Sequence, residues 1–220
     1  MSLPAWPERA RFGERVPRDR LFALAGGGKT IRDLYGTQVE RITWTHKLFP
    51  GSVNLAAGAS VPEIVVLEVT LRSETLDDRV LQHIDEAIPR HTLMELRRGE
   101  EVALAGAFKR RSDADGSRMV IGAHTRTDWH PADAPRTPLP TAIDLDGLYA
   151  GLLRTVWPHP ARSNETLRVH AERLSEAAAC AKTVERLRGR VRREKRYARQ
   201  VELHRELREA ERRLGELIGS

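Results

Sequence analysis

The sequence predicts an α+β protein, in which a mostly antiparallel sheet of about five strands with covering helices precedes a long C-terminal coiled-coil helix. Short runs of alternating apolar and polar residues between positions 39 and 130 indicate half-buried strands. Polar turns separate the later runs, which is typical of antiparallel hairpins. Residues 163–218 contain no proline, and their leucines and alanines recur at spacings of three and four, which favours a coiled coil.

The chain is long enough, at 220 residues, for one domain with a real core plus an appendage. We divide it into an N-terminal arm with short helices (1–38), an α+β core (39–130), a proline-rich linker with a short helix (131–162) and a basic coiled-coil tail (163–220). No stretch approaches the roughly 20 apolar residues that cross a bilayer. The start of the chain lacks a signal peptide, and the single Cys180 has no partner for an intramolecular disulfide. We therefore expect a cytoplasmic protein without a membrane partner.

The elements follow from local signals. Pro17 opens a short helix that Gly26 to Gly28 end, and Thr30 is the expected N-cap of a second helix. A capping pair, Thr75 and Asp78, opens a helix that ends at Pro89. The predicted strands are residues 41–48, 63–71, 92–96, 102–108 and 118–129, of which the second is apolar on both faces in its first half and so belongs at the centre of the sheet.

The last predicted strand carries alternating polar residues. His124, Arg126, Asp128 and His130 would project from one face, where two histidines and an aspartate resemble metal ligands. Arg126 between them would repel a cation, and no other His or Cys cluster completes the set. We therefore expect a solvent-facing polar edge, and we predict no metal site and no cofactor.

Two further motifs resemble parts of known active sites. The run GGGKT (residues 26–30) resembles the end of a phosphate-binding P-loop, but Ala23 occupies the place of the first glycine, so we interpret the run as a helix stop. A metal-dependent nuclease would place a lysine two positions after a strand carboxylate, whereas Thr70 follows Glu68. We predict no catalytic residue. A nuclease or other phosphodiester enzyme with a non-standard site around Glu68 or His124 is kept as the alternative function.

The strongest chemical signal is a run of eight basic residues and one acidic residue between Arg186 and Arg199. Phosphate binding needs several cations close together, because each contact releases condensed counterions. The run therefore predicts either sequence-independent binding of a nucleic-acid backbone or binding of an acidic protein surface, and both stay open. The predicted binding residues are Arg186, Arg188, Arg190, Arg192, Arg193, Lys195, Arg196 and Arg199.

The tail also carries an apolar seam. The spacing of its members favours pairing with another helix, and a shift of phase near Val184 leaves open whether the tail is one helix or a hairpin. A structural homodimer built through this seam is a second alternative function. The seam consists of Leu203, Leu207, Ala210, Leu214 and Leu217.

Several segments together resemble a bacterial family, the domain of unknown function 4391 family. They are VPRDRLF, RITWTHKLFPGSVNLAAG, VPEIVVLEVTL, DDRVLQHIDEAIPRHTLMEL, TDWHP and EKRYARQVELHRELREAERRL, and they cover nearly the whole chain. Four residues match the family pattern without a known role. We expect a loop-fixing side chain at Asn54, a positive φ at Gly58, a helix stop at Pro89 and a core aromatic at Trp129.

The resemblance implies a gene neighbourhood of helicases and DNA methyltransferases in restriction-modification or phage-defence clusters. No catalytic role comes with it. We therefore expect a non-enzymatic accessory subunit of a helicase-associated DNA-processing or anti-phage defence complex, with a helicase or DNA methyltransferase as its partner.

Overall fold

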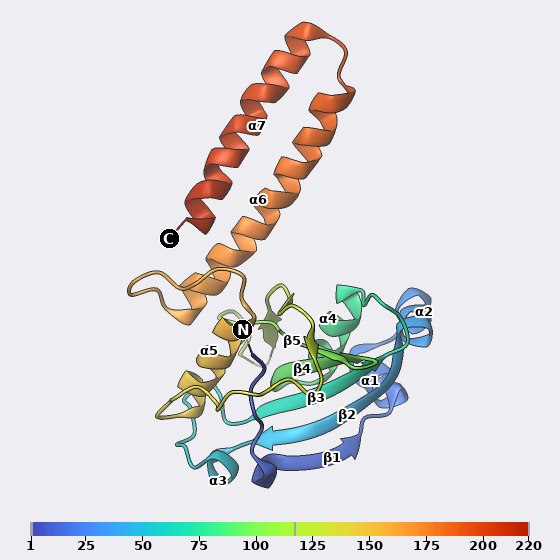
Figure 1. Ribbon diagram of the computed structural model, residues 1–220, viewed down its shortest axis with the longest axis vertical. Coiled ribbons are helices and arrows are strands. Elements are labelled where there is room, and N and C mark those ends of the chain that lie inside the picture. Colours follow the sequence, from blue (N-terminus) through green and yellow to red (C-terminus); the bar gives the residue numbers. More distant parts are fainter. Residues whose placement is uncertain (1, 117, 220) are drawn as a thin grey trace. The chain divides into compact units, whose positions relative to one another are not determined.

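The computed structural model describes residues 2–116 and 118–219 (Figure 1). The chain divides into two compact units, Met1–Pro158 and His159–Ser220, which we call the head and the hairpin. Among the described residues, no helix combines the length and the apolar character needed to cross a membrane.

The head is built on one large sheet with the strand order β1-β2-β3-β4-β5-β8, and β9 also pairs with β5. A separate two-stranded ribbon joins β6 and β7. The strands are β1 (Arg11–Arg15), β2 (Val39–Leu48), β3 (Ile64–Leu71), β4 (His91–Arg98), β5 (Glu101–Gly106), β6 (Lys109–Arg111), β7 (Met119–Ile121), β8 (Thr125–Arg126) and β9 (His130–Pro131).

The sheet is mixed, whereas we predicted a mostly antiparallel one. The central pair β3–β4 runs parallel, and all other neighbouring strands are antiparallel. Parallel neighbours need a crossover connection, which helix α4 (Asp78–Ala87) supplies between the two strands. Strand β3 does lie at the centre, and its first four residues are fully buried, as the apolar run in the sequence predicted.

Helices cover both faces of this sheet. Helices α1 (Arg18–Ala25), α2 (Lys29–Gln38) and α4 contribute to a core cluster with Val65, Leu67 and Val69 of β3. Successive strand residues point to opposite faces, so His91 and Leu93 of β4 point away from that cluster.

Helix α5 (Leu145–Val156) packs on this second face, with the Tyr149 ring 4.7 Å from the His91 ring and the Tyr149 hydroxyl donating to the Ala107 carbonyl. Short helices η1 (Glu8–Ala10) and α3 (Pro50–Val53) complete the head.

Three local predictions for the head are wrong, namely the strand 118–129, the N-cap Thr30 and the capping pair Thr75 and Asp78. The expected strand 118–129 is divided into the short strands β7 and β8, and β9 follows directly after it. Gly28, not Thr30, is the N-cap of α2, and it has an extended backbone. The N-cap of α4 is Asp77, whose carboxylate accepts from the Arg79 N–H at 2.9 Å.

The second unit is an antiparallel pair of helices, α6 (Leu167–Arg193) and α7 (Tyr197–Ile218), joined by residues 194–196 (Figure 1). The sequence left open whether the tail is one long helix or a hairpin, and the structure shows the hairpin. Its apolar core is formed by Leu174, Ala177, Val184 and Leu187 of α6 with Leu203 and Leu217 of α7.

Candidate functional site

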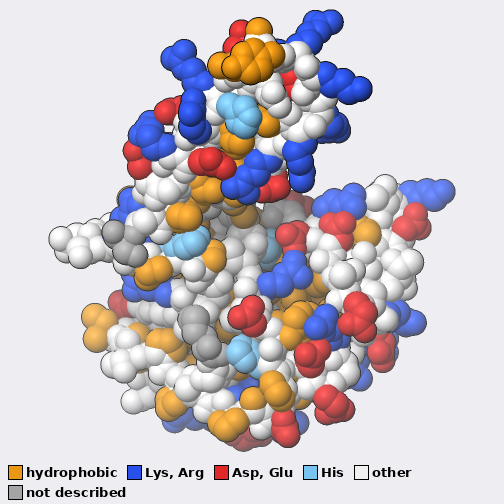
Figure 2. Space-filling view, turned by 45° about the horizontal axis from the view of Figure 1, so that its top comes forward, with side chains coloured by type: hydrophobic (Ala, Val, Ile, Leu, Met, Phe, Trp, Pro, Cys, Tyr) orange, Lys and Arg blue, Asp and Glu red, His pale blue; other side chains and the backbone are white. Residues whose placement is uncertain are grey.

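The basic run occupies the turn end of the hairpin. It comprises the last two turns of α6, the connection 194–196 and the first residues of α7, and we call this region the tip. Residues 159–220 carry 16 basic and 10 acidic side chains, and removing the run 186–199 leaves eight basic and nine acidic ones. The whole positive excess of the hairpin therefore lies at its tip. Figure 2 shows Lys and Arg side chains projecting outward around this unit.

Three of the eight predicted cations lie close to carboxylates and are therefore less available to bind a phosphate. Arg188 pairs with Glu185 and with Glu211 of the opposite helix, at 2.8 and 2.9 Å. Arg190 lies 3.9 Å from Glu206, and Arg199 pairs with Glu202. In the part of the chain that the structure describes, no ion pair involves the other five, which are Arg186, Arg192, Arg193, Lys195 and Arg196.

The one acidic residue at the tip, Glu194, accepts hydrogen bonds from the backbone. Glu194 Oε1 accepts from the N–H groups of Lys195 and Arg196, each at 2.9 Å. These bonds lower the pKa of the Glu194 carboxyl, the bond from Arg196 most strongly. The carboxylate therefore holds the turn between the helices.

Favourable interactions with the helix dipoles explain the positions of only some of these cations. Cations in the last turn of α6 face the negative end of its dipole and stabilise the helix. Lys195 and Arg196 stand at the positive end of α7, where no side chain caps the helix and where cations are unfavourable. The adjacent Glu194 carboxylate attracts Arg196 and offsets part of this cost, but the helix dipole favours neither residue. Beside them Tyr197 is 81% exposed, although an aromatic ring is usually buried.

The predicted seam is occupied within the chain. Leu203 and Leu217 are buried, and Leu207, Ala210 and Leu214 are half-buried along α7. Across the helix pair, Cys180 Sγ donates to the Ala210 carbonyl at 3.3 Å. The apolar surface proposed for a homodimer is therefore covered by α6 of the same chain.

The structure does not bring the four polar residues of the last predicted strand together. His124 Nε2 lies 2.8 Å from Asp85 Oδ2, and Arg126 pairs with Asp78 of α4. His130 is in β9, opposite Val102. Among the described residues, no group of three or more His, Cys, Asp or Glu side chains is arranged to hold a metal ion.

Glu68 is held by two arginines, with Arg97 Nε at 3.1 Å and Arg41 Nη2 at 3.8 Å. Its in-register neighbour on β4 is Glu95, which accepts from Trp6 Nε1 at 2.7 Å and pairs with Arg136. Guanidinium groups at both carboxylates repel a divalent cation. The adjacency of Glu68 and Glu95 was missed from the sequence because it depends on the parallel strand pair.

The GGGKT run ends one helix and starts the next. Gly26 has φ 80° directly after α1, which is a conformation that glycine adopts without strain, and its carbonyl lies 2.6 Å from His83 Nε2. Lys29 and Thr30 are the first residues of α2. A helix stands where a P-loop needs a strand, so the run is a helix stop.

The family-pattern positions have structural surroundings. Asn54 has φ 56° and ends α3. The expected positive φ at Gly58 is wrong. A Cβ there would instead lie 2.7 Å from the Asp146 backbone nitrogen, so glycine allows a close approach. Pro89 follows the last residues of α4, and half-buried Trp129 packs on the core with Arg98 4.0 Å above its ring.

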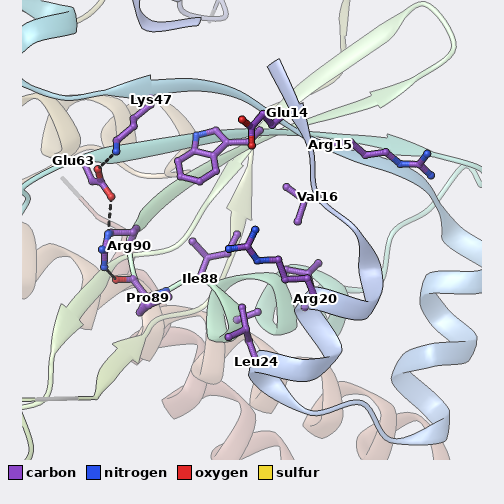
Figure 3. Close-up of a pocket in the computed structure, with 13 residues that line it drawn as sticks. Glu14, Arg15, Val16, Arg20, Leu24, Lys47, Glu63, Ile88, Pro89 and Arg90 are labelled. Atoms are coloured by element: carbon purple, nitrogen blue, oxygen red, sulfur yellow. Dashed lines mark hydrogen bonds and ion pairs between the residues drawn. The ribbon is translucent and has the colours of Figure 1, made fainter. Parts of the chain in front are cut away.

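Sequence reasoning also missed a pocket of about 380 Å³ in the head, between the β1–α1 connection, β2 and the end of α4 (Figure 3). At one end Lys47 and Arg90 pair with Glu63 at 2.8 and 2.6 Å. Burial acts to raise the pKa of Glu63, but the hydrogen bonds from both cations outweigh it and hold the pKa below its usual value. The Glu63 carboxylate is therefore held in its charged form by both cations.

Comparison with known proteins identifies the family and nothing further. Searches for similar curated proteins and for similar solved structures found no match. The family model described as "Domain of unknown function (DUF4391)" matches residues 5–214. This match spans the head and nearly all of the hairpin, so the chain belongs to the DUF4391 family.

Proposed function

We propose that the tip of the hairpin binds the phosphate backbone of nucleic acid without reading its sequence, and that the chain acts as a non-enzymatic accessory subunit. The observation that carries this proposal is a cluster of five cations at one end of a helical pair, for which the described residues offer no ion pair. Lys195 and Arg196, two of the five, stand at an unfavourable helix end. Phosphates are the partners that such a cluster fits, since each cation can neutralise one of them.

Tyr197 favours nucleic acid over an acidic protein surface. Its ring is 81% exposed and stands directly after Arg196 in the chain. An exposed aromatic ring between cations provides a surface on which an unpaired base can stack. We therefore propose that nucleic acid with single-stranded character is preferred to a continuous duplex.

The gene neighbourhood implied by the family resemblance supports a wider proposal. In it, the head docks on a helicase or DNA methyltransferase, while the tip contacts the nucleic acid that this partner processes, as in a DNA-processing or anti-phage defence complex.

Fluorescence anisotropy with a labelled single-stranded oligonucleotide across a salt series tests the tip. The double variant Lys195→Gln/Arg196→Gln should flatten the slope of log affinity against log salt by about 1.4, since each lost phosphate contact on a single strand accounts for about 0.7. The matched control is Arg205→Gln/Arg208→Gln, because these two exposed arginines also lie on α7 but outside the tip. Equal effects of the two double variants, or a wild-type slope near zero, would overturn the proposal.

The same assay tests the base preference. Tyr197→Ala should weaken binding of the single strand by about 1–3 kcal/mol and leave duplex binding nearly unchanged, whereas Tyr197→Phe should retain both. A tip that binds only an acidic protein would show no nucleic-acid binding in any variant.

A further inference from the structure

The head has a second hollow, of about 520 Å³, that shares Arg15 and Val16 with the pocket in Figure 3. In Figure 3 the Arg15 side chain points away from Glu63 and Lys47. Four of the residues that line the second hollow are arginines, which come from β1, α1, β2 and the position directly after β3. They are Arg15, Arg18, Arg41 and Arg72.

Two of these arginines converge on one oxygen atom. Arg18 Nη2 donates to the Val39 carbonyl and, at 3.0 Å, to the Glu40 carbonyl. Arg72 Nε donates to the same Val39 carbonyl at 3.2 Å. Two guanidinium groups within hydrogen-bond distance of one oxygen repel each other, and a neutral carbonyl does not cancel their charge.

Acidic side chains do not resolve this repulsion. Asp19 and Glu40 line the hollow, but within the described residues neither forms an ion pair with an arginine. Arg41 lies 3.8 Å from Glu68, which Arg97 also holds at 3.1 Å. With four arginines against two carboxylates, the lining is positively charged. Each guanidinium group has five N–H donors, so N–H groups remain that can bind a ligand.

The backbone holds these arginines in place. Val16 N–H donates to the Ile42 carbonyl at 2.9 Å, which fixes the segment leading to Arg18 on the edge of β2. The Arg72 N–H donates to the Gln38 carbonyl at 2.9 Å, directly after β3. The two guanidinium groups therefore come from anchored positions, which lowers the entropic cost of gathering them around a ligand.

We propose that this hollow binds a phosphate group, held between the guanidinium groups of Arg18 and Arg72, with Arg41 and Arg15 at its rim. Guanidinium donors match the oxygens of a phosphate in pairs, and a dianion removes the repulsion between the two arginines. The site is independent of the tip and lies in the other unit. The phosphate comes either from a small molecule or from a nucleic-acid backbone.

Two-dimensional ¹H–¹⁵N NMR of the full chain tests this site, with the arginine Nε–Hε signals as the readout. Pyrophosphate should shift the Arg18 and Arg72 signals in a saturable way, and chloride at equal ionic strength should not. Arg72→Gln should weaken pyrophosphate binding at least tenfold. Arg72→Lys should give an intermediate loss, because it keeps the positive charge but lacks the paired N–H donors of a guanidinium group. The control is Arg154→Gln, which removes one exposed arginine of the head outside the hollow.

A short single-stranded oligonucleotide distinguishes the two sources. Saturation by pyrophosphate alone identifies a small phosphate ligand, and saturation of the same signals by the oligonucleotide identifies a backbone contact. Because the tip variant Lys195→Gln/Arg196→Gln keeps the hollow intact, it should still bind pyrophosphate, which separates this proposal from that for the tip. Unsaturable shifts, or an equal loss in Arg154→Gln, would overturn it.

Discussion

Lys109 Nζ lies 3.2 Å from Asp85 Oδ1, and both side chains are almost completely buried, at 0% and 1% exposed. The ammonium group also donates to the carbonyls of Asp85 and Ile88, at 2.9 and 2.7 Å. The second carboxylate oxygen lies 2.8 Å from His124 Nε2. Burial lowers the pKa of Lys109 although Asp85 acts to raise it. This buried pair ties the ribbon strand β6 to the end of α4.

We expect Lys109→Met to lower the free energy of unfolding of the head by about 3–5 kcal/mol, because it leaves the Asp85 carboxylate buried without its cation. Urea denaturation followed by circular dichroism measures this loss. Lys29→Met is the matched control, since Lys29 is exposed at the start of α2 and its replacement should change stability by about 0.5 kcal/mol or less. A loss below about 1 kcal/mol in Lys109→Met would contradict the importance of the pair.

The hairpin contains its own pH-sensitive pair. Glu165 and Arg173 lie 2.7 Å apart with side chains 5% and 7% exposed, and the hydrogen bond from Arg173 lowers the pKa of Glu165 from 4.5 to about 2. Because the unfolded chain takes up this proton first as pH falls, the stabilisation is complete above about pH 5 and is lost between pH 4.5 and pH 2.

Thermal unfolding of wild type and Glu165→Gln should therefore differ by about 2 kcal/mol at pH 6 and converge near pH 2. A constant difference across this range would show that the Glu165 side chain stabilises the hairpin through packing and not through its charge.

Local signals predicted much of the fold. The alternation in β2, the apolar run of β3 and the proline after α4 each act within a few residues, and the structure has these elements close to their predicted bounds. The parallel pairing of β3 with β4 was not predicted, because the choice of partner depends on the α4 crossover and on residues distant in sequence.

In the candidate sites, too, local features could be predicted from the sequence and contacts between distant residues could not. The cluster of basic residues at the tip can be recognised in the sequence. The ion pair that occupies Arg188 cannot, because Glu211 comes close to it only when the chain turns back as a hairpin. Arg18 and Arg72 are separated by 53 intervening residues, and no motif marks their convergence on Val39. The burial of the seam could not be predicted either, because it depends on α7 folding back onto α6 of the same chain.

Gly58 should not tolerate a side chain. A Cβ there would lie 2.7 Å from the Asp146 backbone nitrogen at the start of α5, where the Asp146 carboxylate accepts from the Val61 N–H at 2.8 Å. We expect Gly58→Ala to cost about 1–3 kcal/mol in chemical denaturation through overpacking. Gly116→Ala is the control, because a Cβ at Gly116 meets open space. Equal stability of both variants would show that this loop moves aside freely.

An engineered disulfide tests whether α6 and α7 of one chain pack together. Because Cys180 Sγ lies 3.3 Å from the Ala210 carbonyl oxygen, Ala210→Cys places a second thiol opposite Cys180. Oxidation should give an intramolecular bond, seen on non-reducing electrophoresis as a faster-migrating monomer that resists urea unfolding of the hairpin. A homodimer assembled through the seam would instead give a covalent dimer.

Ala198→Cys is the control for this experiment, because position 198 is 12 residues from position 210 along α7, about 18 Å at 1.5 Å per residue. Its thiol lies too far from Cys180 for an intramolecular bond in the same helix pair. A monomeric crosslink in Ala210→Cys but not in Ala198→Cys would establish the antiparallel register in solution. It would also place the tip cations at the turn of a single-chain hairpin, which is the arrangement that phosphate binding at the tip requires.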